Sequence, residues 1–192
     1  MKKIFIGSLV GAIIMFVWGF LAWAILPIHL HTFMYSPAMD SVAKVMADNN
    51  FESGAYGVPT ADNRNVSGFD SKYQEETQRV MTEGVGKPSI TLFYKKEGYD
   101  MSGLTLFKGF LFNFLAVLAA CIILMPAFTV MDSFFGRWWL VLLIGLLVAA
   151  SSHLMNYNWM GFPWEYSKML VMDVMVNWGI TGLWLSWYFK NK

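Results

Sequence analysis

The chain is poor in cysteine and in charge. Its 192 residues include one cysteine, Cys121, which excludes an intramolecular disulfide and a metal site built from several thiolates. Charged residues make up 14% of the chain, whereas an average soluble domain carries about 25%. The formal net charge is +1 without a clustered basic face, so the composition argues against a nucleic-acid-binding protein.

The sequence also lacks the common short motifs of enzymes. It contains no P-loop, no GxGxxG, no HExxH and no CxxC, and these absences leave glycine-rich phosphate binding and the standard zinc motifs unsupported. No catalytic residue is therefore predicted, and we interpret the protein as non-enzymatic.

Long apolar runs are what the sequence has instead. Hydrophobic residues make up 56% of the chain, and four runs are long enough to cross the roughly 30 Å of bilayer hydrocarbon. The first begins like a signal peptide, but it is longer and richer in Trp than such a segment, so we expect it to be retained. Pro27 and Pro126 are expected to end the first and second helices. The sequence predicts an all-α membrane fold with transmembrane helices at 1–26, 104–125, 138–155 and 169–189.

The basic residues near the ends of these runs predict an orientation. Because lysine and arginine near span ends favour the cytoplasm, both termini are expected there. The opposite side then receives residues 27–103 and the turn 156–168. The bases on the predicted cytoplasmic side are Lys2, Lys3, Arg137, Lys190 and Lys192.

Residues 27–103, between the first span and the three-helix remainder 104–192, are predicted to form a small periplasmic α+β insert. One helix is expected to begin at Ser36 and Pro37, and a second to begin at Asp70 or Ser71 and end at Gly84 or Gly86. "SITLFYKK" is typical of a strand, and "GAYGVP" is a candidate partner strand. About 75 residues bury too little apolar surface for comfortable stability. We therefore expect the insert to lie against the membrane or another protein.

Polar residues in the last two spans form a second feature. Asp173, Asn177 and Thr181 recur every fourth residue and so share one helix face. The turn after the third span is expected to bring Ser152 and His153 close to this face, where His153 or Asn177 would donate to Asp173. A charged residue in a span usually faces a partner or water. The cluster is therefore either structural or part of a proton or solute path that uses Asp173.

All three histidines are expected on the exported side of the membrane. His29 and His31 follow the first span, and His153 lies at the exit of the third. Imidazoles with nearby thioethers would suit copper, and histidine with aspartate would suit zinc. No cofactor is predicted outright, but a copper- or zinc-binding protein that uses these histidines is an alternative function.

Small residues recur along the predicted helices where another helix could approach closely. These faces and the small insert favour an accessory, assembly or scaffold subunit, whose partners are the lipid bilayer and another membrane protein or a second copy. The residues concerned are Gly7, Gly11, Gly109, Asn113, Gly145 and Ala149.

The segments "FVWGFLAWAILPIHLHTF" (16–33) and "NYNWMGFPWEY" (156–166) resemble a group of small uncharacterised bacterial inner-membrane proteins. Members of that group share a first span ending in a Trp-Gly, Trp, Leu-Pro, His pattern, an exported insert, and a last hairpin with an aromatic turn that contains Asn. The resemblance implies a bacterial inner membrane and assigns no reaction.

Overall fold

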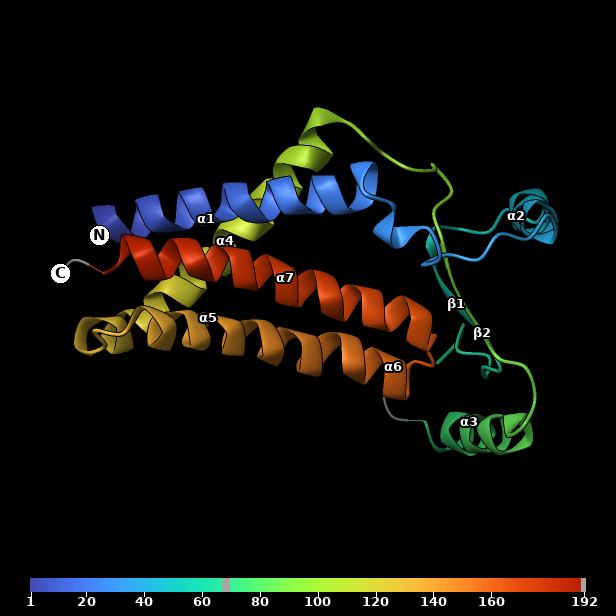
Figure 1. Cartoon of the computed structure of the whole chain (residues 1–192). Helices are drawn as coiled ribbons and strands as arrows, with labels where there is room; N and C mark the ends of the chain where they lie inside the picture. The colour runs from blue at the N-terminus through green and yellow to red at the C-terminus, as the bar shows by residue number, and fades with distance from the viewer. Residues whose placement is uncertain (67–69, 191–192) are drawn as a thin grey trace. The chain divides into compact units, whose positions relative to one another are not determined.

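The computed structural model describes residues 1–66 and 70–190, and the chain divides into two compact units. Unit 1 is formed by Met1–Tyr35 with Met101–Lys192, and unit 2 by Ser36–Asp100. Figure 1 shows the long helices of unit 1 and the short elements of unit 2.

Unit 1 contains the four apolar helices. The spans Lys2–Ile25, Gly103–Val130, Phe134–Trp159 and Trp164–Tyr188 are each long and apolar enough to cross a membrane. The prediction of a mainly helical membrane protein with four spans is thereby confirmed. The first span is α1 (Lys2–Phe20) continued by a π-helical turn, η1 (Leu21–Ile25), and the second and fourth are α4 (Gly103–Val130) and α7 (Trp164–Tyr188). The third is α5 (Phe134–Val148), a second π-helical turn, η3 (Ala149–Leu154), and α6 (Met155–Trp159).

The second span differs from its prediction at Pro126. The helix continues through this proline to Val130, although Pro126 was expected to end it. Proline is tolerated inside membrane helices because neighbouring groups satisfy the backbone that it disturbs. The Thr129 hydroxyl donates to the Pro126 carbonyl over 2.7 Å near the end of this helix, a bond separate from the Ile122 carbonyl that the proline leaves without its backbone donor. In contrast, the first span ends at Ile25, just before Pro27, as predicted.

The helices of unit 1 pack around α7 and α1. Helix α1 packs against α4 and α7, and α7 packs against α5. In Figure 1, α1, α7 and α5 run side by side while α4 crosses them obliquely. Buried side chains from all four spans form the core between them: Met15, Val117, Cys121, Leu124, Val141, Trp178 and Leu185 among others.

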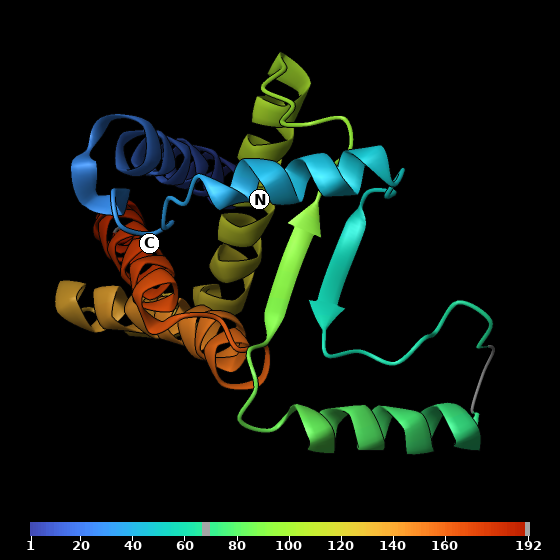
Figure 2. The same ribbon diagram turned by 90° about the vertical axis from the view of Figure 1, so that its right-hand side faces the viewer.

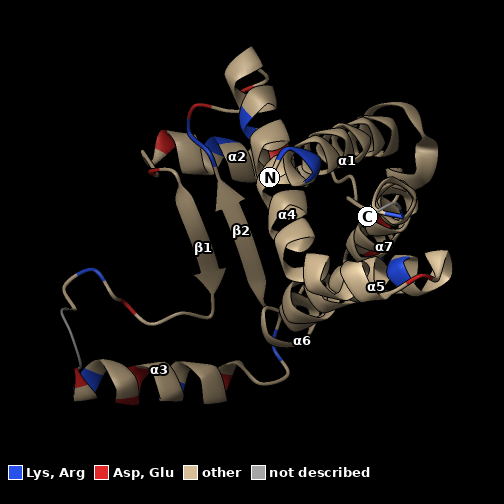
Figure 3. Ribbon diagram, turned by 90° about the vertical axis from the view of Figure 1, so that its left-hand side faces the viewer, with Lys and Arg blue, Asp and Glu red and all other residues tan. Residues whose placement is uncertain are grey.

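The end of unit 1 that holds α1's first residue and α7's last is called the terminus end. Here the buried Arg137 guanidinium donates to two carbonyl oxygens, over 2.6 Å to Met131 and 3.1 Å to Ser186. It thereby caps the C-terminal end of α4 and ties it to the last turn of α7. The Trp184 indole also donates to the Gly7 carbonyl of α1 over 3.1 Å. Figure 3 shows how few charged residues lie along these spans.

Unit 2 consists of two helices and a two-stranded sheet. The antiparallel strands β1 (Gly54–Val58) and β2 (Ile90–Tyr94) pair from Gly54 opposite Tyr94 to Val58 opposite Ile90 (Figure 2). The two predicted strands are therefore present and paired.

The two helices of unit 2 are α2 (Ala38–Asp48) and α3 (Ser71–Gly84). Helix α3 begins as predicted, because the Asp70 carboxylate accepts from the Tyr73 backbone N–H over 3.0 Å. Helix α2 begins later than predicted, since Pro37 takes the capping position instead of Ser36.

Candidate functional site

Asp173 lies in the third turn of α7 and is the centre of a polar cluster at the end of unit 1 opposite the terminus end. We call this end the Asp173 end. The side chain is 15% exposed, and its Oδ2 atom accepts a hydrogen bond from Trp23 Nε1 over 3.0 Å. His29 Nε2 also lies 3.0 Å from Oδ2, in ion-pair contact but outside hydrogen-bond alignment. A mostly buried carboxylate in a span is therefore paired, as its desolvation requires.

The His29 ring is held in place by neighbours other than Asp173 as well. Its side chain is 7% exposed, and its ring stacks on the Trp23 indole with centroids 3.9 Å apart and an angle of 10° between the planes. Its other nitrogen, Nδ1, lies 3.0 Å from the hydroxyl oxygen of Thr32, which is itself buried. The imidazole is thus fixed by stacking, by a hydroxyl and by a carboxylate.

Backbone irregularity accompanies the cluster. Trp23 lies in the π-helical turn η1, and His29 ends the short 3-10 turn η2 (Pro27–His29). The second π-helical turn, η3, packs against α7. Single π-helical turns inside membrane-length helices are uncommon and occur frequently at functional sites. Both such turns of the described chain therefore lie next to the helix that carries Asp173.

The expected donor to Asp173 is wrong. In the part of the chain that the structure describes, neither His153 nor Asn177 donates to this carboxylate; Trp23 does, with His29 in contact. His153 and Ser152 lie in η3, and neither donates a hydrogen bond to Asp173 within the described residues. The π-helical turn changes the angular spacing of its side chains, which a regular helical pattern cannot anticipate.

Buried polar atoms continue from Asp173 along α7. Asp173 Oδ1, Asn177 Oδ1 and Thr181 Oγ1 are all buried without a hydrogen-bond partner among the described residues. Trp18 Nε1, on α1, is a buried donor in the same condition. Thr181 is fully buried against Gly11 of α1, and Ser186 Oγ, further along α7, is also buried without a partner among the described residues. The predicted face of α7 thus points into unit 1 as a one-sided polar track.

The three histidines occupy different surroundings. His29 faces Asp173, His31 is exposed in the turn that follows η2, and His153 lies on η3. Within residues 1–66 and 70–190, no three His, Cys, Asp or Glu side chains are grouped as metal ligands. Copper or zinc binding therefore stays a prediction from sequence.

Three of the predicted small-residue positions are filled by the chain's own side chains. A Cβ atom at Gly7 would meet the Phe189 ring at 2.9 Å, and one at Gly11 would meet Val117 at 2.7 Å. At Gly145 the neighbour is Trp178, at 2.8 Å. Ala149 is fully buried. These faces pack unit 1 internally and leave no room for a partner.

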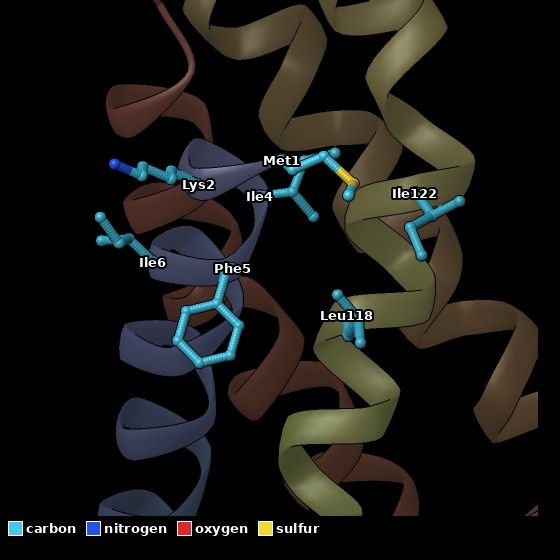
Figure 4. A pocket seen from close by; sticks show the side chains of 7 residues that line it. All are labelled: Met1, Lys2, Ile4, Phe5, Ile6, Leu118 and Ile122. Carbon is cyan, nitrogen blue, oxygen red and sulfur yellow. The ribbon is translucent and has the colours of Figure 1, made fainter.

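Two grooves open where α1 and α4 diverge on either side of their crossing. The first, the Leu118 groove, has a volume of about 560 Å³ and an almost wholly apolar lining, shown in Figure 4. Its lining residues are Met1, Lys2, Ile4, Phe5, Ile6, Leu118 and Ile122.

The second groove lies toward the Asp173 end and differs in chemistry. This Asn113 groove has a volume of about 320 Å³ and includes a polar amide. Gly19 and Gly109 both line it, and a Cβ atom at either would meet nothing within 4 Å. The Asn113 side chain forms no hydrogen bond within the described residues. The remaining lining residues are Met15, Phe16, Phe20, Trp23 and Leu106.

Sequence reasoning found Asp173 but missed its partners. Trp23 was assigned no role from sequence, and His29 was predicted only as a candidate copper or zinc ligand. The only available signal was the position of both residues at the exit of the first span, on the same side as Asp173. Arg137 was likewise used for orientation, although it is a buried structural group with 3% exposure.

No protein-family model, curated protein or solved structure matches this chain. The proposals below therefore rest on its own residues.

Proposed function

We propose that the protein is a non-enzymatic accessory or scaffold subunit that binds a transmembrane helix of a partner protein in the Asn113 groove. The observation that carries this proposal is the unpaired Asn113 amide in a groove between two membrane-length helices. An amide in hydrocarbon needs a hydrogen-bond partner, and interhelical hydrogen bonds of Asn are a recurrent means of helix association.

The contrast between the two grooves supports a helix as the occupant. The lining of the Leu118 groove includes no uncharged polar side chain. Lipid acyl chains can therefore fill this groove without leaving an amide or hydroxyl group unpaired. The Asn113 groove combines two glycines with an amide, the pair of features that lets helix backbones approach and hydrogen-bond. The acyl chains of the bilayer hydrocarbon carry no group that could hydrogen-bond to the Asn113 amide.

Unit 2 gives independent support for a partner. Met46 and Ala61 are its buried apolar side chains in the described part, and neither helix packs extensively on the sheet. Large apolar side chains remain exposed on both strands, including Val58, Ile90 and Phe93. Exposed apolar surface of this kind often marks a protein or membrane contact.

We further propose a bacterial inner-membrane location with both termini cytoplasmic and unit 2 in the periplasm. Lys2, Lys3 and Lys190 lie at the terminus end and support this orientation. Arg137 lies at the same end, but its guanidinium donates hydrogen bonds to backbone carbonyls. The formal charge of the insert is negative, with seven bases and ten acids, which suits an exported segment.

The test is native mass spectrometry of the protein extracted gently from its own membranes. Gly109→Leu adds a large side chain at a position where a Cβ atom meets nothing within 4 Å, and Asn113→Leu removes the amide. Both should abolish a defined assembly that wild type shows. Ala119→Leu makes a similar increase in size on an exposed part of the same helix and should leave the assembly intact.

An assembly unchanged by both groove variants would refute the proposal. If the mass of the assembly is a multiple of the mass of this chain alone, the partner is a second copy of the chain and not a different protein.

A second candidate function is favoured by the Asp173 cluster. A paired carboxylate that heads a buried polar track is the arrangement expected of a proton or solute path. Liposomes that contain the protein should then show a pH- or ion-dependent flux that Asp173→Asn changes. A flux equal to that of empty liposomes would remove this candidate.

A further inference from the structure

We propose that the Leu118 groove binds one anionic phospholipid, with an acyl chain in the groove and the headgroup phosphate at the lysines of the terminus end. The groove lies between the N-terminal turns of α1 and the turn of α4 from Leu118 to Ile122. Its volume of about 560 Å³ is within the range of roughly 300–1,000 Å³ that small-molecule sites occupy. This site is distinct from the Asn113 groove, so it does not depend on a partner helix.

The lining of the groove suits a hydrocarbon chain. Figure 4 shows Phe5 in the middle of the groove, with Ile6 on one side and Leu118 on the other. The Phe5 and Ile122 side chains are 54% and 58% exposed, so both present apolar surface that the described residues leave uncovered. Apolar surface between two membrane-length helices is satisfied by contact with lipid chains.

The groove is closed at its inner end. The Phe5 ring contacts the Phe114 ring of α4 edge to face, with centroids 5.6 Å apart. Phe114 lies one turn before Leu118 on α4, so this contact joins the two helices on the side of the groove away from the terminus end. An acyl chain therefore enters the groove from the terminus end, and its headgroup stays there.

Two lysines at the same end supply positive charge for that headgroup. Lys2 forms one edge of the groove, and its side chain makes no hydrogen bond or ion pair within the described residues. Figure 4 shows this side chain extending outward from the edge. Lys3 Nζ lies 5.8 Å from the centroid of the Tyr188 ring and 5.9 Å from that of Phe189, a cation–π placement that holds its charge at this level.

The remaining charges at the terminus end leave its net charge positive. Arg137 donates to two backbone carbonyls, and Lys190 Nζ lies 5.8 Å from the centroid of the Trp187 ring. Asp132, between α4 and α5, is the acidic residue at this end, and no ion pair joins it to Lys2 within the described residues. Basic pockets between transmembrane helices bind the headgroups of anionic lipids.

An anionic phospholipid is the ligand class that matches both features of the site. A soluble anion would need only the lysines, and a neutral lipid would need only the groove. A zwitterionic phospholipid carries a phosphate but also a cation, which Lys2 and Lys3 would repel. The combination of an apolar groove with two lysines at its mouth therefore selects a lipid of net negative charge.

Native mass spectrometry of the purified full chain in detergent micelles tests this site. The protein is freed of lipid and then titrated with dioleoyl phosphatidylglycerol or dioleoyl phosphatidylcholine, which share their acyl chains and differ in headgroup charge. We expect wild type to bind one molecule of phosphatidylglycerol at least about fivefold more tightly than phosphatidylcholine, since one lysine near the bilayer surface contributes a factor of about five.

Two pairs of variants separate the groove from the charge. Ile122→Trp fills the groove and should abolish the one-to-one complex with either lipid, whereas Ile123→Trp, at a 66% exposed position outside the groove, should keep it. Lys2→Gln should weaken phosphatidylglycerol binding about fivefold and leave phosphatidylcholine binding unchanged. Lys190→Gln, which removes a charge of the same end outside the groove, should keep the preference.

Equal affinity of wild type for the two lipids, or a complex that survives Ile122→Trp, would overturn the proposal. A preference that falls equally in Lys2→Gln and Lys190→Gln would also overturn it, because the preference would then come from the general charge of this end and not from a site. Asn113→Leu should leave all of these affinities unchanged, so a failure here is distinct from a failure to bind a partner helix.

Discussion

The two ends of unit 1 each hold a charged side chain of low exposure, but they satisfy it in different ways. At the terminus end, Arg137 is held by two backbone carbonyls, whose charge and position are fixed. At the Asp173 end, the carboxylate is held by an indole and an imidazole, two side chains from the end of the first span and the turn that follows it. The difference separates a charge held by backbone groups from a charge held by side chains alone.

The largest expected effect is at the fixed end. Arg137→Met removes the donor of two carbonyls and should lower the free energy of unfolding by about 3 kcal/mol, since each orphaned buried acceptor costs roughly 1–3 kcal/mol. Chemical denaturation in mixed micelles measures the loss. Arg79→Met, which removes only exposed ion pairs of α3, is the matched control and should change little. If both variants lost the same free energy of unfolding, Arg137 would not be the residue that holds α4 and α7 together.

The packing between the two ends can be tested with one substitution at two places on α1. Gly11→Val adds a Cβ atom 2.7 Å from the Val117 side chain and should destabilise the protein by about 2 kcal/mol through overpacking. A Cβ atom at Gly19 meets nothing within 4 Å, so Gly19→Val should leave stability nearly unchanged. Thermal unfolding in the same detergent compares the two variants. If Gly19→Val were the less stable of the two variants, α1 and α4 would have to cross at a different point.

A smaller effect is expected at the Asp173 end, where side chains hold the charge. Asp173→Asn retains an oxygen that can accept from Trp23 and loses only the charge, so the cost in stability should be about 1 kcal/mol. The same denaturation experiment gives the value. If Asp173→Asn lowered the free energy of unfolding as much as Arg137→Met does, Asp173 would also hold helices together. The two ends would then not differ in this respect.

The smallest effect lies in unit 2, where ion pairs are exposed. Hydrogen bonds from Arg79 lower the pKa of Glu76 below its ordinary value. Because the folded-state pKa is depressed, this contribution to stability is present above the ordinary value and is lost as the pH falls through the depressed one. Glu76→Gln should therefore differ slightly from wild type near neutral pH and match it in acid.

Far-UV circular dichroism during thermal unfolding checks this prediction. Glu75→Gln, on the same helix, makes the same change in charge without removing a hydrogen bond of Arg79 and is the control. A difference for Glu76→Gln that grows in acid would contradict the assigned ion pair.

Apolar run length predicted the four spans because bilayer thickness sets helix length directly. The Asp70 cap and the two strands of unit 2 were predicted for a similar reason, since each depends on local sequence. The continuation through Pro126 was missed because the membrane environment, and not the residue, decides whether proline ends a helix.

The partners of Asp173 could not be read from periodicity. Trp23 and His29 reach it across 150 and 144 residues of sequence, and a π-helical turn sets the orientation of Trp23. The small-residue faces were visible, but sequence could not tell that Gly11 is filled by the chain itself while Gly109 is left open. Such assignments require the angle at which α1 and α4 cross.

Photo-cross-linking in native membranes tests the proposed function most directly. A photoreactive side chain is introduced at Leu106, in the Asn113 groove, or at Leu118, in the apolar groove. The account predicts one discrete protein adduct from position 106 that disappears in Asn113→Leu and persists in Ala119→Leu, with only lipid adducts from position 118. Lipid adducts alone from both positions, or a protein adduct indifferent to Asn113, would contradict the claim that this groove binds a partner helix.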